Sequence, residues 1–179
     1  MVPRLRFKDD NGQEFPEWVE KKFGQLFSIG SGRDYKHLEE GKIPVYGSGG
    51  IMTYVNEYLY DGESVGIGRK GTIDKPIFLE GMFWTVDTLF YTHSFVGSIP
   101  KYIFYLFQNL NWYRYNEASG VPSLSKSTIE KIFQQIPSLE EQQKIASFLS
   151  SIDKKIETTS TQLEKTRDFK KGLLQQMFV

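Results

Sequence analysis

Cysteine is absent from this sequence of 179 residues, and only two histidines, His37 and His93, are present. Without cysteine the chain can form no disulfide, no thiolate nucleophile and no cysteine-ligated zinc site. The two histidines have no partners at metal-ligand spacing, so we expect no bound metal in this chain. The lack of cysteine also suits a reducing compartment, and we predict a cytoplasmic location.

Long apolar runs are absent as well. The longest, residues 103–107, is far shorter than the ~20 residues that span a bilayer, and the first residues contain no signal-peptide core. We therefore expect no membrane partner. Phosphate-binding P-loops and nucleophile-elbow motifs are also missing, so the sequence predicts a chain without catalytic activity of its own.

An excess of charge of either sign is the third absence. The chain has 22 basic and 22 acidic residues, and its formal net charge is zero. Phosphate contacts usually leave a basic footprint, so composition argues mildly against nucleic-acid binding. Aromatic residues make up 15% and charged residues 25% of the chain, which is typical of a folded protein rather than a disordered one.

Proline does not occur after Pro137, and the C-terminal stretch contains a single glycine, Gly172. We therefore predict one long helix over residues 139–178, roughly 60 Å in length. Ser138 is a good N-cap, and Glu141, three residues later, completes a capping box. This helix is the element around which we expect the rest of the chain to be organised.

The predicted helix carries an apolar seam whose spacings alternate between four and three residues, which is a heptad pattern. Thr159, Thr166 and Lys170 also occupy seam positions and weaken its middle. A helix with one apolar stripe needs a partner surface, which is either its own domain or another chain. We favour a homodimer, because ~60 Å exceeds the width of a domain of this size. The predicted dimerisation residues are Ile145, Leu149, Ile152, Ile156, Leu163, Leu173 and Met177.

Residues 1–137 form, by prediction, a domain in which short β-prone runs alternate with glycines. Pro100 begins a helical pattern with Ser98 as its cap, and residues 125–131 form a helical turn. The sequence thus predicts an α+β fold: a compact, curved, β-rich domain with a few helices, followed by one long coiled-coil helix over residues 138–179. The predicted strands include residues 51–55, 58–60, 64–67, 76–79, 85–92 and 132–136.

Residues 66–71, Gly-Ile-Gly-Arg-Lys-Gly, match the spacing of a dinucleotide-binding fingerprint. That motif needs a helix at its end to receive the pyrophosphate, whereas here β-branched residues and then Pro76 follow. Two interpretations remain. Either Arg69 and Lys70 grip backbone phosphates from a glycine-rich turn, or the turn is ordinary solvated surface.

Five separated motifs follow one another along the chain. They are P-V-Y-G-S-G-G at 44–50, I-G-R-K-G-T-I at 67–73, F-W-T-V-D-T-L at 83–89, G-V-P-S-L-S at 120–125 and I-P-S-L-E-E-Q-Q-K-I-A at 136–146. In this order they resemble the DNA specificity subunit of type I restriction–modification systems, over essentially the whole chain. The recognition domain of that family is similar to the target-recognition fold of adenine methyltransferases.

A specificity subunit of that family usually carries two tandem halves, each a target-recognition domain followed by a long helix, whereas this sequence carries one. The resemblance therefore implies either a half-size subunit that dimerises or a fragment of a longer chain. It further implies that two long helices pair antiparallel, that each domain reads one part of a split double-stranded DNA site, and that the helices dock methyltransferase subunits.

Cofactors are expected only in the partner subunits. The methyltransferase subunits bind S-adenosylmethionine and flip the adenine, while ATP and magnesium are also expected only outside this chain. Whether restriction subunits, which act as nuclease and translocase, join is left open. This chain lacks the Asn/Asp-Pro-Pro-Tyr/Phe motif of adenine methyltransferases, so the resemblance implies a non-catalytic subunit without a cofactor.

The resemblance also reconciles DNA recognition with zero net charge, since a recognition domain can concentrate a few contacts in loops while partner subunits bind much of the phosphate backbone. The alternative is a coiled-coil interaction module whose head binds protein, and an unrecognised enzyme is a third hypothesis. The target bases stay undetermined. The candidate DNA-contacting residues are Arg33, Lys36, Tyr46, Gly47, Ser48, Gly49, Arg69, Lys70, Trp84 and Lys126.

Overall fold

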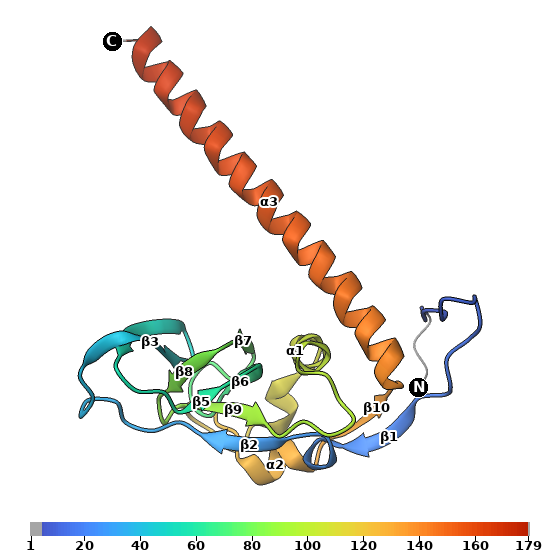
Figure 1. Ribbon diagram of the computed structural model, residues 1–179. Helices are drawn as coiled ribbons and strands as arrows, with labels where there is room; N and C mark the ends of the chain where they lie inside the picture. The colour runs from blue at the N-terminus through green and yellow to red at the C-terminus, as the bar shows by residue number, and fades with distance from the viewer. Residues whose placement is uncertain (1–4, 179) are drawn as a thin grey trace.

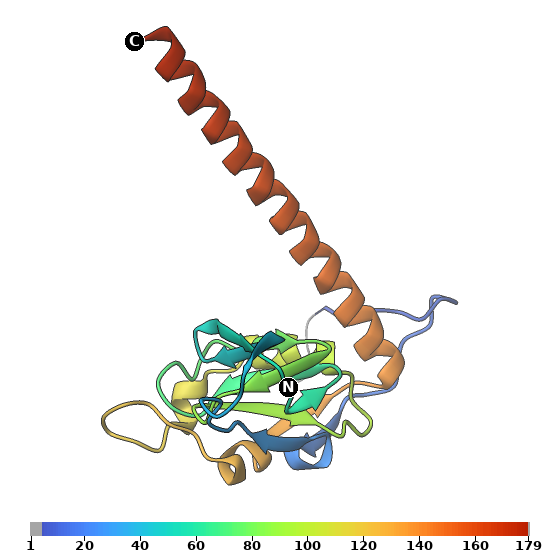
Figure 2. The ribbon, with the colours of Figure 1, turned by 60° about the vertical axis from the view of Figure 1, so that its left-hand side comes forward.

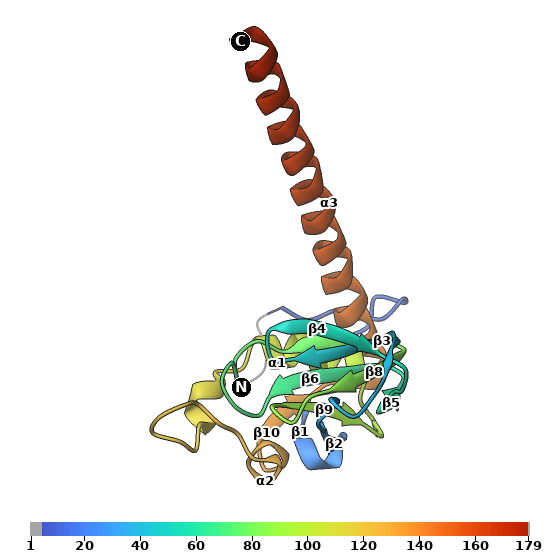
Figure 3. The same ribbon diagram turned by 90° about the vertical axis from the view of Figure 1, so that its left-hand side faces the viewer.

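A long helix projects from a β-rich head in the computed structural model, which describes residues 5–178 (Figure 1). The helix, α3 (Leu139–Met177), has 39 residues and extends far beyond the head in every view (Figure 2 and Figure 3). The predicted α+β fold with a long C-terminal helix is thereby confirmed. Among the described residues, no helix combines the length and the apolar character that crossing a membrane requires.

The main core of the head lies between one sheet and a short helix. The antiparallel sheet has the strand order β2-β9-β6-β7. Buried Ile67 and Phe90 from this sheet join buried Ile103 and Phe107 from α1 (Pro100–Gln108) in one apolar cluster. The strands are β2 (Ser28–Ser31), β6 (Ser64–Gly68), β7 (Ile77–Leu79) and β9 (Leu89–His93).

A second sheet, with the strand order β4-β3-β8-β5, meets the first through aromatic side chains. The ring centroids of Phe83 and Tyr91, one from each sheet, are 5.9 Å apart. Its own small core consists of Val45, Trp84 and two further valines. The strands are β3 (Glu40–Gly47), β4 (Gly50–Val55), β5 (Tyr60–Asp61) and β8 (Met82–Thr85).

Two strands from opposite ends of the sequence of the head pair with each other, just before α3 begins. β1 (Val19–Lys22) and β10 (Phe133–Ile136) form an antiparallel ribbon that lies at the base of α3 (Figure 1). The short helices η1 (Phe23–Gln25) and α2 (Lys126–Glu130) contact one another nearby, while η2 (Trp112–Tyr115) follows α1. The chain therefore enters and leaves the head at one place.

The single strand predicted over residues 85–92 is wrong, because the chain forms two strands there that belong to different sheets. The N–H of Val86 donates to the carbonyl of Tyr46 at 3.0 Å, and the N–H of Leu89 donates to the carbonyl of Val86 at 2.9 Å. A turn at residues 86–88 thus carries the chain from β8 to β9. Apolar patterning could not locate this turn, since the strands on both sides of it are buried.

Of the two predicted helix caps, one is confirmed and the other is wrong. Ser138 caps α3, since its Oγ accepts from the N–H of Glu141 at 3.3 Å. The carboxylate of Glu141 does not complete the box and instead accepts hydrogen bonds from the N-terminal segment. Ser98 does not cap α1: its buried Oγ donates to the carbonyl of Leu26 at 2.8 Å, and the cap position is Ile99.

The first turns of α3 are anchored in the head by a fully buried amide. The side chain of Gln142 donates to the carbonyls of Gly97 (3.1 Å) and Pro137 (3.0 Å) and accepts from the N–H of Ile99 (3.0 Å). One turn later, Ala146 enters the main core. The amide is buried away from water, so a shift of the junction would leave its polar atoms without hydrogen-bond partners. The junction therefore has little freedom to move.

Beyond this junction, α3 leaves the head. The hydroxyl of Tyr105 donates to Oδ2 of Asp153 at 2.6 Å, and residues 154–171 are all exposed. The alternative that the helix lies along its own domain is therefore wrong. Ile145 is partly buried against the main core, so the first residue of the predicted seam serves the head rather than a free surface.

Candidate nucleic-acid interface

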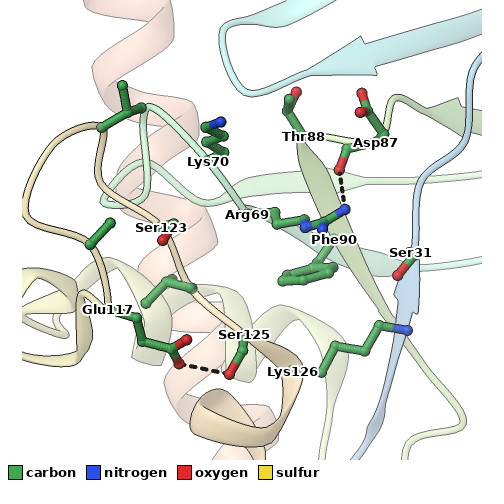
Figure 4. Close-up of a pocket in the computed structure, with 13 residues that line it drawn as sticks. Ser31, Arg69, Lys70, Asp87, Thr88, Phe90, Glu117, Ser123, Ser125 and Lys126 are labelled. Atoms are coloured by element: carbon green, nitrogen blue, oxygen red, sulfur yellow. Dashed lines mark hydrogen bonds between the residues drawn. The ribbon is translucent and has the colours of Figure 1, made fainter.

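A groove of about 740 Å³ opens on one edge of the head, where the turn after β6 faces the segment that precedes α2 (Figure 4). Its cations are Arg69, Lys70 and Lys126, and its acidic side chains are Asp87 and Glu117. Three predicted DNA-contacting residues from two distant parts of the sequence therefore lie in one groove.

Tight turns hold Arg69 at the mouth of this groove. A Cβ atom at Gly68 would collide with the carbonyl oxygen of Thr72, so the chain can turn there only at glycine. The N–H of Arg69 donates to the carbonyl of Thr88 at 2.8 Å, and its Nη1 donates to the carbonyl of Asp87 at 3.3 Å. The guanidinium is thus oriented by the turn at residues 86–88 while the side chain stays exposed.

Phe90 forms the floor of the groove between two cations. The guanidinium carbon of Arg69 lies 6.0 Å and the Nζ of Lys126 lies 5.9 Å from the centroid of the Phe90 ring. Figure 4 shows Arg69 above this ring, with Lys126 approaching from the opposite side. The electron-rich face of an aromatic ring attracts cations, so the ring helps to keep both charges in the groove.

Glu117 stands on the far wall and has its own hydrogen-bond donors. The hydroxyl of Ser125 donates to its Oε1 at 2.6 Å, and the hydroxyl of Thr128 donates to the same oxygen. These bonds hold the pKa of the Glu117 carboxyl below its ordinary value of 4.5. Since Ser125 also caps α2, the carboxylate ties the loop before α2 to the start of that helix.

A second groove, of about 760 Å³, adjoins the first because Asp87 and Thr88 line both. One wall is the turn between β3 and β4, where the φ of +113° at Gly50 requires glycine. The two grooves together are called the grooved edge below. Four predicted DNA-contacting residues line the second groove: Lys36, Gly47, Ser48 and Gly49.

The other three predicted residues lie outside the linings of the two grooves. Arg33 is exposed after β2, and Tyr46 is half-buried with its ring edge-on to Phe83 at 6.4 Å. Trp84 is only 5% exposed, and its indole N–H donates to the carbonyl of Arg33 at 2.9 Å. Trp84 is therefore corrected to a core residue that supports Arg33, because its ring has almost no surface left for a ligand.

Sequence reasoning did not single out Phe90 or Glu117 as part of this site. Ser125 is a residue type favoured at helix N-caps, but no local pattern connects that cap to Glu117. Phe90 looks like any other apolar strand residue. Their place in the groove depends on the way β9 packs beside the segment before α2.

The apolar seam of α3 is exposed once the helix has left the head. Leu149 is half-buried, and the later predicted seam residues are 40–71% exposed. An exposed stripe of large apolar side chains marks an interaction surface. These exposed seam residues are Ile152, Ile156, Leu163, Leu173 and Met177.

Sequence comparison finds a matching protein family and several similar proteins. The family described as type I restriction modification DNA specificity domain matches residues 16–166. The type I restriction enzyme EcoprrI specificity subunit of Escherichia coli is 27% identical over 157 residues, covering 83% of this chain and 38% of that protein. The MjaVIII specificity subunit of Methanocaldococcus jannaschii is 30% identical over 126 residues, covering 67% of this chain and 27% of that protein.

Structural comparison finds the same fold at low sequence identity. The crystal structure of the type I restriction–modification S subunit from M. genitalium superposes with a TM-score of 0.75 at 16% identity, covering 94% of this chain and 46% of that chain. The HsdS subunit from Thermoanaerobacter tengcongensis gives a TM-score of 0.62 at 15% identity, covering 80% of this chain and 39% of that chain. This chain spans less than half the length of each of these relatives.

Proposed function

The chain belongs to the family of type I restriction–modification DNA specificity domains, and we propose that its head reads one part of a two-part site on double-stranded DNA. The observation that carries this proposal is the convergence of four cations on the grooved edge: Lys36, Arg69, Lys70 and Lys126. Contacts to phosphates fix the register of a protein on DNA, and a neutral chain can supply them from one such edge.

Acidic side chains also line the grooved edge, so we propose a few well-placed contacts rather than a broad basic face. Glu117 is occupied by two hydroxyl donors. Asp87 is exposed on the turn common to both grooves and is a suitable acceptor for a cytosine amino group. In this arrangement Arg69 and Lys70 position the head on phosphates, while Asp87 and the glycine-rich loop at residues 47–49 face base edges.

Assembly is the second part of the proposal. Two copies pair antiparallel through the seam of α3, so that their heads lie at opposite ends and each reads one part of the site. Lys170 favours this direction, because an in-register parallel pair would bring two Lys170 side chains together in the seam. The helices also dock methyltransferase subunits that bind S-adenosylmethionine. ATP and magnesium belong to other subunits, and this chain is non-catalytic.

The double variant Arg69→Ala/Lys70→Ala tests the role of the first groove. The assembled complex with its methyltransferase subunits is titrated with salt on a cognate and a scrambled DNA. If each side chain meets one phosphate, the slope of log affinity against log salt concentration should shrink by roughly two, and binding to both DNAs should weaken about equally.

Lys42→Ala/Lys75→Ala is the matched control, since it removes two exposed lysines that line neither groove. This control should keep the slope of the unaltered protein. An unchanged slope in a correctly folded Arg69→Ala/Lys70→Ala complex would show that the turn at residues 66–71 is only solvated surface. Complete absence of DNA binding by the unaltered complex would instead favour a head that binds protein, to which the zero net charge of the chain is better suited.

A further inference from the structure

An N-terminal arm, residues 5–18, packs against the first turns of α3, and most of it precedes residue 16, where the family match begins. Its anchor is Glu141, whose side chain is completely buried. Arg6 donates to this carboxylate from Nε (3.2 Å) and Nη2 (2.8 Å), and the indole N–H of Trp18 donates at 3.0 Å. A buried carboxylate held by three donors strongly resists separation from them.

Further contacts follow along the same side of α3. The Nζ of Lys144 donates to the carboxylate of Asp10 at 2.6 Å, which lowers the pKa of Asp10, and also to a backbone carbonyl of the arm at 2.9 Å. One turn later the rings of Phe7 and Phe148 meet edge to face, with centroids 5.5 Å apart. The arm therefore follows α3 for about two turns.

The head holds α3 from the other side. At ~100° per residue, the positions that contact the arm and those that contact the head are separated by roughly 150° around the helix. Figure 1 agrees, since α1 and the blue N-terminal arm flank the base of α3. The helix cannot swing toward either side without breaking contacts on the other. The arm holds Glu141, Lys144 and Phe148, and the head holds Gln142, Ala146 and Asp153.

We propose that the arm, through the pair of Arg6 and Glu141, fixes the angle at which α3 leaves the head and thereby selects the length of DNA between the two parts of the site. This inference rests on the proposed function, in which paired helices hold two heads apart. One added base pair moves the second part of the site by about 3.4 Å and turns it by about 35°. A junction whose angle can vary tolerates that displacement, whereas a junction whose angle is fixed does not. Arg6 is thus a positioning residue.

The angle can be measured by spin labelling, because the chain has no cysteine of its own. Labels on Glu57→Cys in the head and Lys165→Cys on α3 occupy exposed positions, and dilution with unlabelled protein restricts the measured distance to one chain. The protein with its native arm should give one narrow distance distribution. Arg6→Ala should broaden or shift that distribution. Glu14→Ala should not, because Glu14 pairs with Lys8 within the arm.

Arg6→Ala leaves Glu141 buried without its cation, so Lys144→Ala is made in parallel. This second variant removes the contacts of α3 with Asp10 while the buried pair stays intact. It should also broaden the distribution, to a smaller degree. Where Arg6→Ala fails to fold, the result of Lys144→Ala decides. A distribution as narrow as that of the unaltered protein in the folded variants overturns the proposal.

Spacer selection is then measured on the assembled complex with two-part sites whose spacers differ by one base pair. The unaltered protein should prefer one spacer. Arg6→Ala should reduce the affinity ratio between the best and the next spacer by about tenfold. A tenfold change in an equilibrium constant is about the contribution of one charge-assisted hydrogen bond. The affinity for DNA that carries only one half of the site should stay unchanged. An unchanged ratio despite a broadened distance would overturn spacer selection. If the unaltered complex binds no DNA, the proposed function fails and spacer selection with it, whereas the distance measurement still decides whether the arm sets the angle.

Discussion

Glu141 and Gln142, two adjacent polar residues at the start of α3, are both completely buried. Each is compensated by hydrogen bonds from distant segments, Glu141 to Arg6 and Trp18 and Gln142 to the loop before α1. A buried carboxylate or amide is stable only with such partners, so these two side chains determine where the helix joins the head. Both are polar residues and neither was assigned to the apolar seam, although Gln142 lies three residues before Ile145 and continues the seam spacing.

Glu117 provides a pH-dependent prediction. The depressed pKa of its carboxyl means that the ionised form stabilises the fold above the ordinary value of 4.5 and that this stabilisation is lost as the pH falls through the lowered pKa. We therefore expect the unaltered protein to melt at a higher temperature than Glu117→Gln at about pH 7, with a difference that shrinks in acid. Thermal unfolding followed by circular dichroism measures it, and a difference that is constant with pH would contradict the assignment.

At the level of the element, α3 combines two surfaces with different neighbours. Its first four turns contact the head and about two of them also contact the arm, whereas residues 154–171 are surrounded by solvent in the isolated chain. Large apolar side chains recur along the exposed part, including Phe169 at 67% exposure outside the seam. A helix of this kind gains most of its stability from a packed apolar face, so we propose that the exposed seam pairs with another helix.

The seam makes a prediction about assembly. Ile152→Asp/Ile156→Asp places two charges per chain where the partner helix would bury them, which should weaken the dimer by several kcal/mol and give monomers. Ser151→Asp/Thr158→Asp is the control, since it adds the same charge away from the seam. Light scattering measures the mass of each protein. A monomer of 20.7 kDa for the unaltered chain at roughly tens of micromolar would contradict pairing through α3.

For the whole molecule, the head and the long helix present different kinds of surface. The head brings four cations and three acidic side chains together on one edge, and the long helix carries an apolar seam away from it. We propose that both features serve binding. The chain spans less than half the length of its relatives, so we propose that two copies or two halves are needed for a complete recognition unit.

A methyl-transfer assay tests the prediction that this chain is non-catalytic. The purified chain should transfer no methyl group from labelled S-adenosylmethionine to DNA, because its sequence has neither a cofactor-binding loop nor the catalytic motif of adenine methyltransferases. Addition of the methyltransferase subunits should restore transfer to DNA that carries the site. Incorporation of label by the chain alone, after a control for contaminating methyltransferase, would require a catalytic site in the head.

Local signals in the sequence were sufficient for the long helix, for the starts of the two short α-helices and for the family. The N-cap at Ser138, the lack of proline after it and the heptad spacing predicted α3 correctly, because caps and helical periodicity act over a few residues. Pro100 likewise marked the start of α1, and Ser125 the start of α2. The five motifs, by their order along the chain, indicated the specificity-subunit family, and the family match over residues 16–166 agrees.

Contacts between distant segments could not be derived in this way. The turn at residues 86–88, the burial of Trp84 and the meeting of Arg69 with Lys126 all depend on how two sheets and a late loop pack together. The bond between Arg6 and Glu141 joins residues 135 positions apart, and the local capping pattern pointed to a different partner for that carboxylate. Long-range pairing is chosen by burial and by the need to satisfy buried polar groups in the folded chain, and neither is visible in a short window of sequence.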